Sequence, residues 1–197
     1  DYTEFFIPVY QREYSWELEQ LADLFYDISD TDPNPEKTGE GHFFGSILTH
    51  EKKETESKVG EIIDGQQRVT TIYLLLNEIK KKLYDHLSTN INEVEKSNIN
   101  DAVKEIDSFI LKKSKGFGVK KQKFNHIPKL KLGKRNKDLF ENIINNKKLD
   151  PTIAKSENNL INASLFFSRK IEDYDVESLM NLLNQVVYSE IIVITSE

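Results

Sequence analysis

Apolar residues in the first half of the chain fall into short extended runs and longer helical repeats. Pro8 disfavours a helix at the residue before it, so the apolar residues around it indicate an extended segment. Ser15 is a suitable N-terminal cap for the helical repeat that follows. A second repeat, with apolar residues three and four positions apart from Val69 onward, predicts a strong helix with one apolar face. In chain order the pattern predicts an extended segment at 4–10, a helix at 16–28, strands at 42–49 and 59–63, and a helix at 69–83.

Helical repeats dominate the second half of the chain. The pattern there predicts one short strand at 127–132 and helices at 98–112, 138–145, 158–171 and 176–186. The closing run Ile191–Ile194 is β-branched, which is typical of a buried strand. Because the chain ends only a few residues later, we expect the natural protein to continue. Together these elements predict an α+β fold.

Composition narrows the classes of protein that fit. The chain has 197 residues, of which 38% are hydrophobic, and its 11 Phe and 8 Tyr supply material for a sizeable core. It has no cysteine, which excludes disulfides, a thiolate nucleophile and a Cys-ligated zinc ion. Its four histidines lack metal-ligand spacing, and the sequence has no Walker loop, no His-Asn-His arrangement and no credible Ser-His-Asp set. With no signal peptide and no run approaching the roughly 20 apolar residues of a membrane span, we expect a cytoplasmic protein without a membrane segment.

The chain is acidic overall but contains one strongly basic segment. The net charge is −6, yet the stretch from Lys112 to Lys137 holds eleven lysine and arginine residues and no acidic residue. Such a block beside an acidic body is a candidate surface for DNA phosphates, contacted without reading the base sequence. A solvated lysine-rich loop is the alternative, and the sequence leaves both open. The candidate DNA-binding residues are Lys112, Lys113, Lys115, Lys120, Lys121, Lys123, Lys134 and Arg135.

The junction between the strand at 59–63 and the long helix is the sharpest chemical feature. Its sequence is Asp64-Gly65-Gln66-Gln67-Arg68, followed one residue later by Thr70-Thr71. A strand that enters a helix through a glycine leaves backbone N–H groups unpaired at the helix start, and these attract an anion such as a phosphate. Gly65 lets a ligand approach closely, Arg68 offers a planar fork for phosphate oxygens, and Asp64 is suited to hold a metal or position a water. The alternative is an ordinary Asp-Gly turn with solvated glutamine and arginine side chains.

A second cluster, from Ile7 to Trp16, is dense in Tyr, Trp, Gln and Arg. These residue types stack on bases and bind phosphates through a guanidinium fork. The aromatic residues are also suitable core anchors for the first helix, and for Trp16 we favour that structural role. Gln11 and Arg12 lie between aromatic residues just before a helix start, so for them we favour ligand binding.

Three motifs follow one another along the first 75 or so positions. They are Ile7-Pro8-Val9-Tyr10-Gln11-Arg12-Glu13-Tyr14-Ser15-Trp16, Phe43-Phe44-Gly45-Ser46-Ile47 and Ile62-Ile63-Asp64-Gly65-Gln66-Gln67-Arg68-Val69-Thr70-Thr71. In this order they resemble the N-terminal domain of the GmrSD-like restriction enzymes. The resemblance implies a small mixed β-sheet of ParB/sulfiredoxin type elaborated by a largely helical second half. It also implies a nucleotide-binding core at 1–85 and a helical extension at 86–197, which holds the basic segment 112–137 and the closing strand, in one structural unit truncated at its C-terminus.

The resemblance further implies a function. In that family the Asp-Gly-Gln-Gln-Arg segment is associated with binding and hydrolysis of a nucleoside triphosphate, with Mg²⁺ as the expected cofactor. We therefore expect a regulatory NTPase domain of a DNA-targeting restriction or anti-phage system, of unspecified base preference. Full-length members often carry a C-terminal domain with a His-Asn-His nuclease motif, so a nuclease domain or subunit is the expected partner. The implied catalytic residues are Asp64, also the metal ligand, and Arg68, and the implied nucleotide-binding residues are Tyr10, Gln11, Arg12, Gly65, Gln66, Gln67, Arg68, Thr70 and Thr71.

Two other functions stay open at this point. One is a nuclease that nicks DNA at the same segment, although few carboxylates lie near Asp64 in the sequence. The other is a non-catalytic sensor of DNA or of a modified base, with Tyr10, Tyr14 and Trp16 lining its pocket.

Overall fold

The main sheet has five strands in the order β6-β1-β3-β2-β7 in the computed structural model of the chain. The structure describes residues 4–39, 41–54, 57–89, 91–114, 125–133, 136–147 and 158–196. The strands are β1 (Glu4–Phe6), β2 (Phe43–Glu54), β3 (Ser57–Asp64), β6 (Leu130–Lys131) and β7 (Glu190–Ser196). β2 and β3 are antiparallel and the other neighbouring pairs are parallel, so the sheet is mixed. This sheet and the helices that follow it confirm the predicted α+β class.

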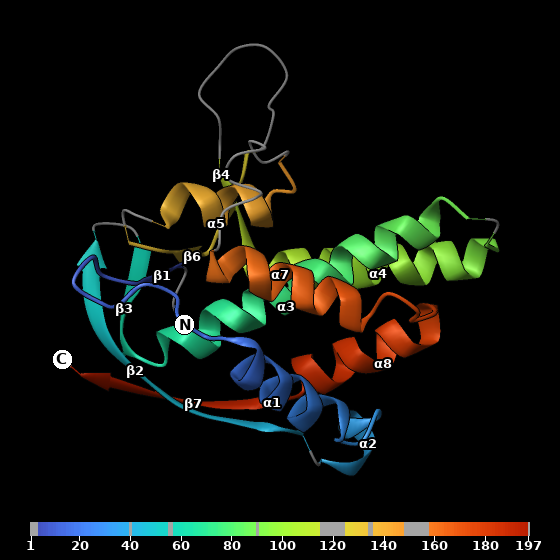
Figure 1. Cartoon of the computed structure of the whole chain (residues 1–197), viewed down its shortest axis with the longest axis horizontal. Coiled ribbons are helices and arrows are strands. Elements are labelled where there is room, and N and C mark those ends of the chain that lie inside the picture. Colours follow the sequence, from blue (N-terminus) through green and yellow to red (C-terminus); the bar gives the residue numbers. More distant parts are fainter. Residues whose placement is uncertain are drawn as a thin grey trace.

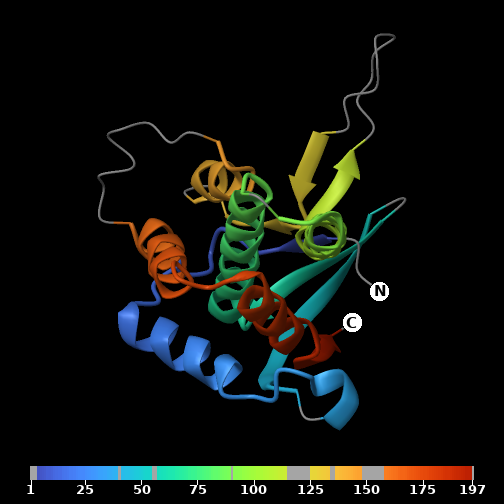
Figure 2. The same cartoon turned by 90° about the vertical axis from the view of Figure 1, so that its right-hand side faces the viewer.

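The helices gather around one long helix. They are α1 (Leu18–Ser29), α2 (Pro35–Thr38), α3 (Gln66–Leu87), α4 (Glu93–Ile110), α5 (Lys137–Ile144), α7 (Asn159–Lys170) and α8 (Val176–Val187). Figure 2 shows α3 at the centre, and α4, α5, α7 and α8 all contact it. A separate two-stranded sheet, β4 (Leu111–Ser114) and β5 (Asn125–Pro128), follows α4 (Figure 1). Among the described helices, none has both the length and the apolar composition that a membrane crossing requires.

Burial on all sides distinguishes α3 from the helix that the sequence predicts. Every residue from Val69 to Lys80 is buried, so burial in this part of the helix extends beyond the apolar face that the sequence predicts. The apolar repeat places its leucines and isoleucines in the core, as expected, but helices cover the polar side as well. The buried polar residues of α3 therefore need partners on those helices.

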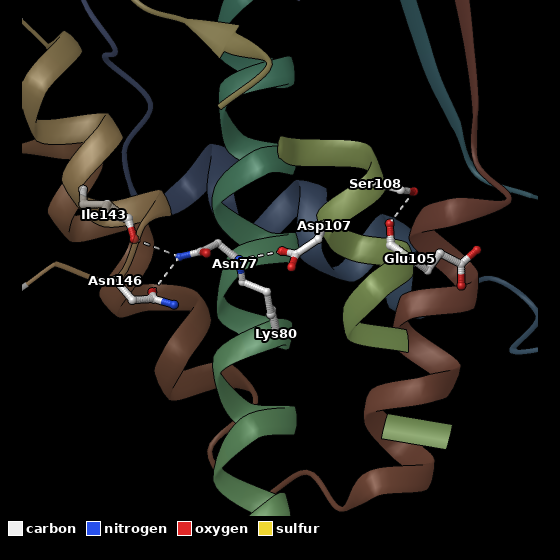
Figure 3. A network of polar contacts seen from close by, with 7 residues as sticks. All are labelled: Asn77, Lys80, Glu105, Asp107, Ser108, Ile143 and Asn146. Atoms are coloured by element: carbon white, nitrogen blue, oxygen red, sulfur yellow. Dashed lines mark hydrogen bonds and ion pairs between the residues drawn. The ribbon is translucent and has the colours of Figure 1, made fainter. Parts of the chain in front are cut away.

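Figure 3 shows the partners of two of these buried polar side chains. Asn77 is fully buried, and its side-chain Nδ2 donates to the carbonyl oxygen of Ile143, near the end of α5, at 3.1 Å. One turn later, the Nζ of Lys80 lies 3.0 Å from Oδ1 of Asp107 on α4 and forms an ion pair with it. These contacts fix α4 and α5 against the central helix, and so hold the second half of the chain to the first.

Several helices begin at positions other than those predicted, and α1 and α4 show why. α1 starts at Leu18, and the backbone N–H of Glu17 donates to the side chain of Gln20 at 2.9 Å. Glu17 is therefore the N-cap residue, and the assignment of that role to Ser15 is wrong. α4 starts five residues earlier than predicted, because Asn92 caps it by accepting a hydrogen bond from the N–H of Glu95 at 2.9 Å.

The closing strand β7 is exposed, contrary to the prediction of a buried strand. It pairs in parallel with β2 at the edge of the sheet, and its four apolar residues are 37–53% exposed (Ile191, Ile192, Val193 and Ile194). A continuous β-branched run is typical of a parallel strand covered on both faces. The β-branched residues of this run favour an extended backbone, but they do not determine whether the strand is covered by other elements.

Candidate functional site

The Asp-Gly-Gln-Gln-Arg segment forms the turn between β3 and α3. Asp64 is the last residue of the strand, Gly65 is the N-cap with φ 92°, and Gln66 begins the helix. A Cβ at Gly65 would lie 2.6 Å from Cγ2 of Ile47, so this position requires glycine for both its backbone angle and its contact. The first turn of α3 has no side-chain cap and no acidic residue. Its N–H groups and positive dipole end are therefore not neutralised by the segment itself.

A cavity of about 620 Å³ lies beside this first turn. Gln66, Gln67 and Thr70 line it from α3, while Gln11 and Arg12 line it from the irregular stretch that follows β1, here called the 8–16 segment. We call this cavity the first cavity. It therefore brings together residues of the two clusters that the sequence singled out, which lie more than fifty positions apart.

Gln67 uses both ends of its side chain to hold the 8–16 segment. Its Oε1 accepts a hydrogen bond from the backbone N–H of Ser15 at 2.8 Å, and its Nε2 donates to the carbonyl oxygen of Glu13 at 3.0 Å. Thr71, one turn further along α3, is 2.7 Å from the hydroxyl of Tyr14. Both Gln67 and Tyr14 are buried, and burial raises the pKa of the Tyr14 hydroxyl.

Two further contacts fasten the start of the same segment. The side chain of Gln11 donates to the carbonyl oxygen of Ile63 at 2.9 Å and accepts from Nε2 of Gln66 at 3.2 Å. The hydroxyl of Tyr10 donates to Oε1 of Glu61 on β3 at 2.7 Å. Tyr10 does not line the first cavity and is 70% exposed.

Arg12 differs from its neighbours in the segment. Its side chain is exposed, and it forms no ion pair with the residues that the structure describes. It lines the first cavity together with the start of α3. An unpaired guanidinium beside an uncapped helix N-terminus is an arrangement that suits a phosphate group.

Arg68 lies on the other side of the helix start. Successive helical residues are about 100° apart, so Arg68 points roughly opposite to Gln66. Its Nη1 donates to the carbonyl oxygen of Ser46 at 3.3 Å, and it lines a second cavity of about 340 Å³ together with Trp16 and His42. Gly45, with φ 84°, makes room for the guanidinium, because a Cβ there would lie 3.1 Å from Nη1. The predicted phosphate ligands therefore divide between two cavities that flank one helical turn.

Asp64, Thr70 and Thr71 do not form a metal-binding site by themselves. Asp64 is exposed at the end of β3, and the described residues contain no group of three histidine or acidic side chains that would hold a metal ion by itself. One carboxylate together with nucleotide phosphates is a common way to bind Mg²⁺, so the residues present fit an ion that arrives with its nucleotide. Thr70 and Thr71 donate their hydroxyls to the backbone carbonyls of Gln66 and Gln67 at 2.7 and 2.8 Å.

The basic block is only partly described. Lys112 forms an ion pair with Glu4 on β1, and Lys131 pairs with the same carboxylate at 2.5 Å. The Nζ of Lys129 donates to the carbonyl oxygen of Ser108 at 2.5 Å. These lysines of the block thus attach the base of the β4–β5 sheet and β6 to the rest of the domain. Lys113 lies in β4, and the candidate DNA-binding residues outside the described part of the chain are Lys115, Lys120, Lys121, Lys123, Lys134 and Arg135.

Sequence reasoning missed the far wall of the first cavity, which Leu132, Gly133 and Asn136 form. A Cβ at Gly133 would lie 3.2 Å from Cα of Val9, so this glycine lets the 8–16 segment pass close to the end of β6. The only feature in the sequence that points to this wall is Gly133, which directly follows the strand predicted at 127–132. It gave no indication of which distant segment approaches it.

The ion pairs beside the site predict an acid-sensitive fold. Burial opposes ionisation of Glu4, but Lys112 and Lys131 outweigh it and lower its pKa. Hydrogen bonds from Lys52 and Tyr10 lower the pKa of Glu61 below its ordinary value of 4.5. Since both pKa values are depressed in the folded state, the stabilisation is complete above pH 4.5 and is lost as the pH falls below it.

We therefore expect Glu61→Gln to destabilise the protein at pH 6 and to flatten the fall in stability between pH 5 and 3. Urea unfolding across this range measures both effects. Glu93→Gln is the control, because the Glu93 side chain is 88% exposed and its pair with Lys96 lies within one helix. Parallel pH profiles for wild type and Glu61→Gln would contradict the prediction.

Comparison with known proteins identifies the family of the chain. A search of the curated proteins finds no match to the chain. The family model for the GmrSD restriction endonuclease N-terminal domain matches residues 1–196, which is nearly the whole chain and includes all three motifs. The chain therefore belongs to the family of GmrSD restriction endonuclease N-terminal domains.

Proposed function

We propose that this domain binds and hydrolyses a nucleoside triphosphate, and that it regulates a DNA-targeting restriction system through this reaction. The observation that carries the proposal is that the unpaired Arg12 lines one cavity with the uncapped start of α3. A cavity of about 620 Å³ lies within the range of small-molecule sites. Family membership supports the restriction setting, in which a nuclease domain or subunit is the partner.

The phosphates are the part of the ligand that this site is best suited to bind. The first N–H groups of α3 and its dipole favour negative charge at the entrance of the helix. Arg12 adds a planar fork that pairs with two phosphate oxygens. Arg68 lies on the opposite side of the same helical turn, in the second cavity, and we assign to it a longer-range contribution of positive charge near the phosphates.

Asp64 is assigned to the attacking water. It accepts a hydrogen bond and then a proton from that water, which adds to the terminal phosphorus as the bond to the leaving phosphate oxygen breaks. The products are a nucleoside diphosphate and inorganic phosphate. Mg²⁺, when bound by the phosphates and Asp64, supplies further charge neutralisation.

Thermal unfolding of the chain with ATP, GTP, CTP or UTP, each with Mg²⁺, tests the binding step. A nucleotide at one hundred times its dissociation constant stabilises the fold by about 2.7 kcal/mol, which raises Tm on the order of 5–10 °C. Arg12→Ala is expected to abolish most of this rise, because charge-assisted hydrogen bonds contribute about 1.5–3 kcal/mol. Arg169→Ala is the matched control, since Arg169 is exposed on α7 and lines neither cavity.

Phosphate release tests the hydrolysis step separately. We expect Asp64→Asn to keep most of the nucleotide-induced rise in Tm, because the phosphates still hold Mg²⁺, and to lose phosphate release. The absence of a rise with every nucleotide would overturn the proposal, as would equal effects of Arg12→Ala and Arg169→Ala.

A further inference from the structure

We infer that Gln67 is the positioning residue of this site: its side-chain amide fixes the backbone of residues 13–15 and thereby places Arg12 opposite the start of α3. The effect on nucleotide binding rests on the proposed function, whereas the effect on the backbone does not. This inference gives Gln67 a different role from the ligand role that the sequence suggested.

The hydrogen bonds of Gln67 are the first reason. Its Oε1 accepts from Ser15 N–H at 2.8 Å, and its Nε2 donates to Glu13 C=O at 3.0 Å. The side chain thus satisfies one backbone donor and one backbone acceptor on either side of Tyr14, as a neighbouring strand would. Since Gln67 is only 6% exposed, both ends of its amide are committed to protein before any ligand arrives.

The second reason is the lack of regular structure where these bonds are made. Residues 12–16 belong to no helix or strand, so no ladder of backbone hydrogen bonds holds them. Gln67 is the second residue of a helix that is buried on all sides from Val69 to Lys80, and this helix is therefore a rigid support. The contact between Tyr14 and Thr71 lies one turn further along and adds a second attachment to the same helix.

Arg12 is held on both sides by these attachments. Before it, Gln11 is bound to Ile63 and Gln66, and after it the bonds of Gln67 begin at Glu13. Its backbone is therefore fixed while its side chain stays exposed and without an ion pair in the described part of the chain. A cation placed in advance binds a phosphate without the entropy cost of ordering the segment that carries it.

Hydrogen exchange in the absence of nucleotide tests the positioning directly. The Ser15 amide is expected to be protected in the wild type, although it lies outside every helix and strand, and to exchange about tenfold faster in Gln67→Ala. Gln185→Ala is the matched control. Gln185 is 5% exposed and donates to the backbone carbonyls of Ser29 and Thr31, so it is a comparable buried amide at a distant place.

We expect Gln185→Ala to lower overall stability without changing the exchange of the Ser15 amide. Gln67→Glu is the second variant if Gln67→Ala does not fold. It keeps an acceptor for Ser15 N–H and loses the donor to Glu13, so we expect partial protection. Equal exchange of the Ser15 amide in wild type and in the folded Gln67 variant would overturn the inference.

A double-mutant cycle distinguishes positioning from direct ligand contact. If Gln67 acts through Arg12, then Arg12→Ala with Gln67→Ala loses no more nucleotide-induced stabilisation than Arg12→Ala alone. Additive losses would overturn the positioning role and support a direct contact. If no nucleotide stabilises the wild type, the proposed function fails, and the exchange of the Ser15 amide still decides whether Gln67 fixes the segment.

Discussion

Replacing Phe167 by alanine is expected to lower the free energy of unfolding by about 3–5 kcal/mol. Phe167 lies on α7 with no exposed surface, and its ring centroid is 6.3 Å from that of Phe25 on α1. Truncation removes a large buried apolar area and leaves a cavity where two helices meet, because neither helix can collapse fully into it. Leu165→Ala is the control on the same helix: Leu165 is 46% exposed, so a loss below about 1 kcal/mol is expected.

The same variant tests whether the two halves of the chain unfold together. One apolar core contains residues from Ile7 to Val186, so damage to α7 should destabilise the residues before 85 as well. Trp16, the single tryptophan, reports on the first half by fluorescence, while circular dichroism reports mainly on the helices. We expect the two signals to change at the same urea concentration in wild type and in Phe167→Ala. Separate midpoints would contradict a single structural unit and favour two domains divided near residue 85.

Local sequence was sufficient to predict those elements whose signals are local. The predicted helix at 158–171 corresponds to α7 (Asn159–Lys170), and that at 176–186 corresponds to α8 (Val176–Val187). In both helices the apolar repeat and the N-cap residue lie within a few positions of each other in the sequence. Asp175, for example, accepts a hydrogen bond from the N–H of Ser178 at 2.8 Å. The glycine of the Asp-Gly-Gln-Gln-Arg segment likewise predicted the strand-to-helix turn, because a positive φ is a local requirement.

Properties that depend on distant partners were not predictable in this way. The apolar repeat of α3 has one face, yet the helix is buried on all sides from Val69 to Lys80, because α5 and α4 cover Asn77 and Lys80. The contact of Lys112 with DNA stays a prediction, but its ion pair with Glu4, a residue 108 positions away, could not be read from the sequence. Gln67 belongs to a recognisable motif, but its bonds to Glu13 and Ser15 depend on how the 8–16 segment passes α3. In each case the residue type is read from the sequence and its partner is set by the tertiary fold.

Replacing Gly65 by alanine is expected to destabilise the protein by about 2–5 kcal/mol, because two separate costs combine. The backbone at Gly65 has φ 92°, a conformation that costs an L-residue roughly 1–2 kcal/mol. The new Cβ would also lie 2.6 Å from Cγ2 of Ile47, and relief of such a clash in a packed core costs about 1–3 kcal/mol. Gly39→Ala isolates the first cost, since Gly39 has φ 72° and a Cβ added there would meet no atom within 4 Å.

The difference between the two glycine variants therefore measures how tightly β2 packs against the start of α3. Ile47→Ala in the Gly65→Ala background removes the clashing methyl group, so the double variant should be more stable than the sum of the single losses predicts, by about 1–3 kcal/mol. Additive losses would mean that the turn moves away from Ile47 instead. Such a movement would shift the first N–H groups of α3, and the rise in Tm with nucleotide that the proposed function predicts should then be lost even where the fold survives.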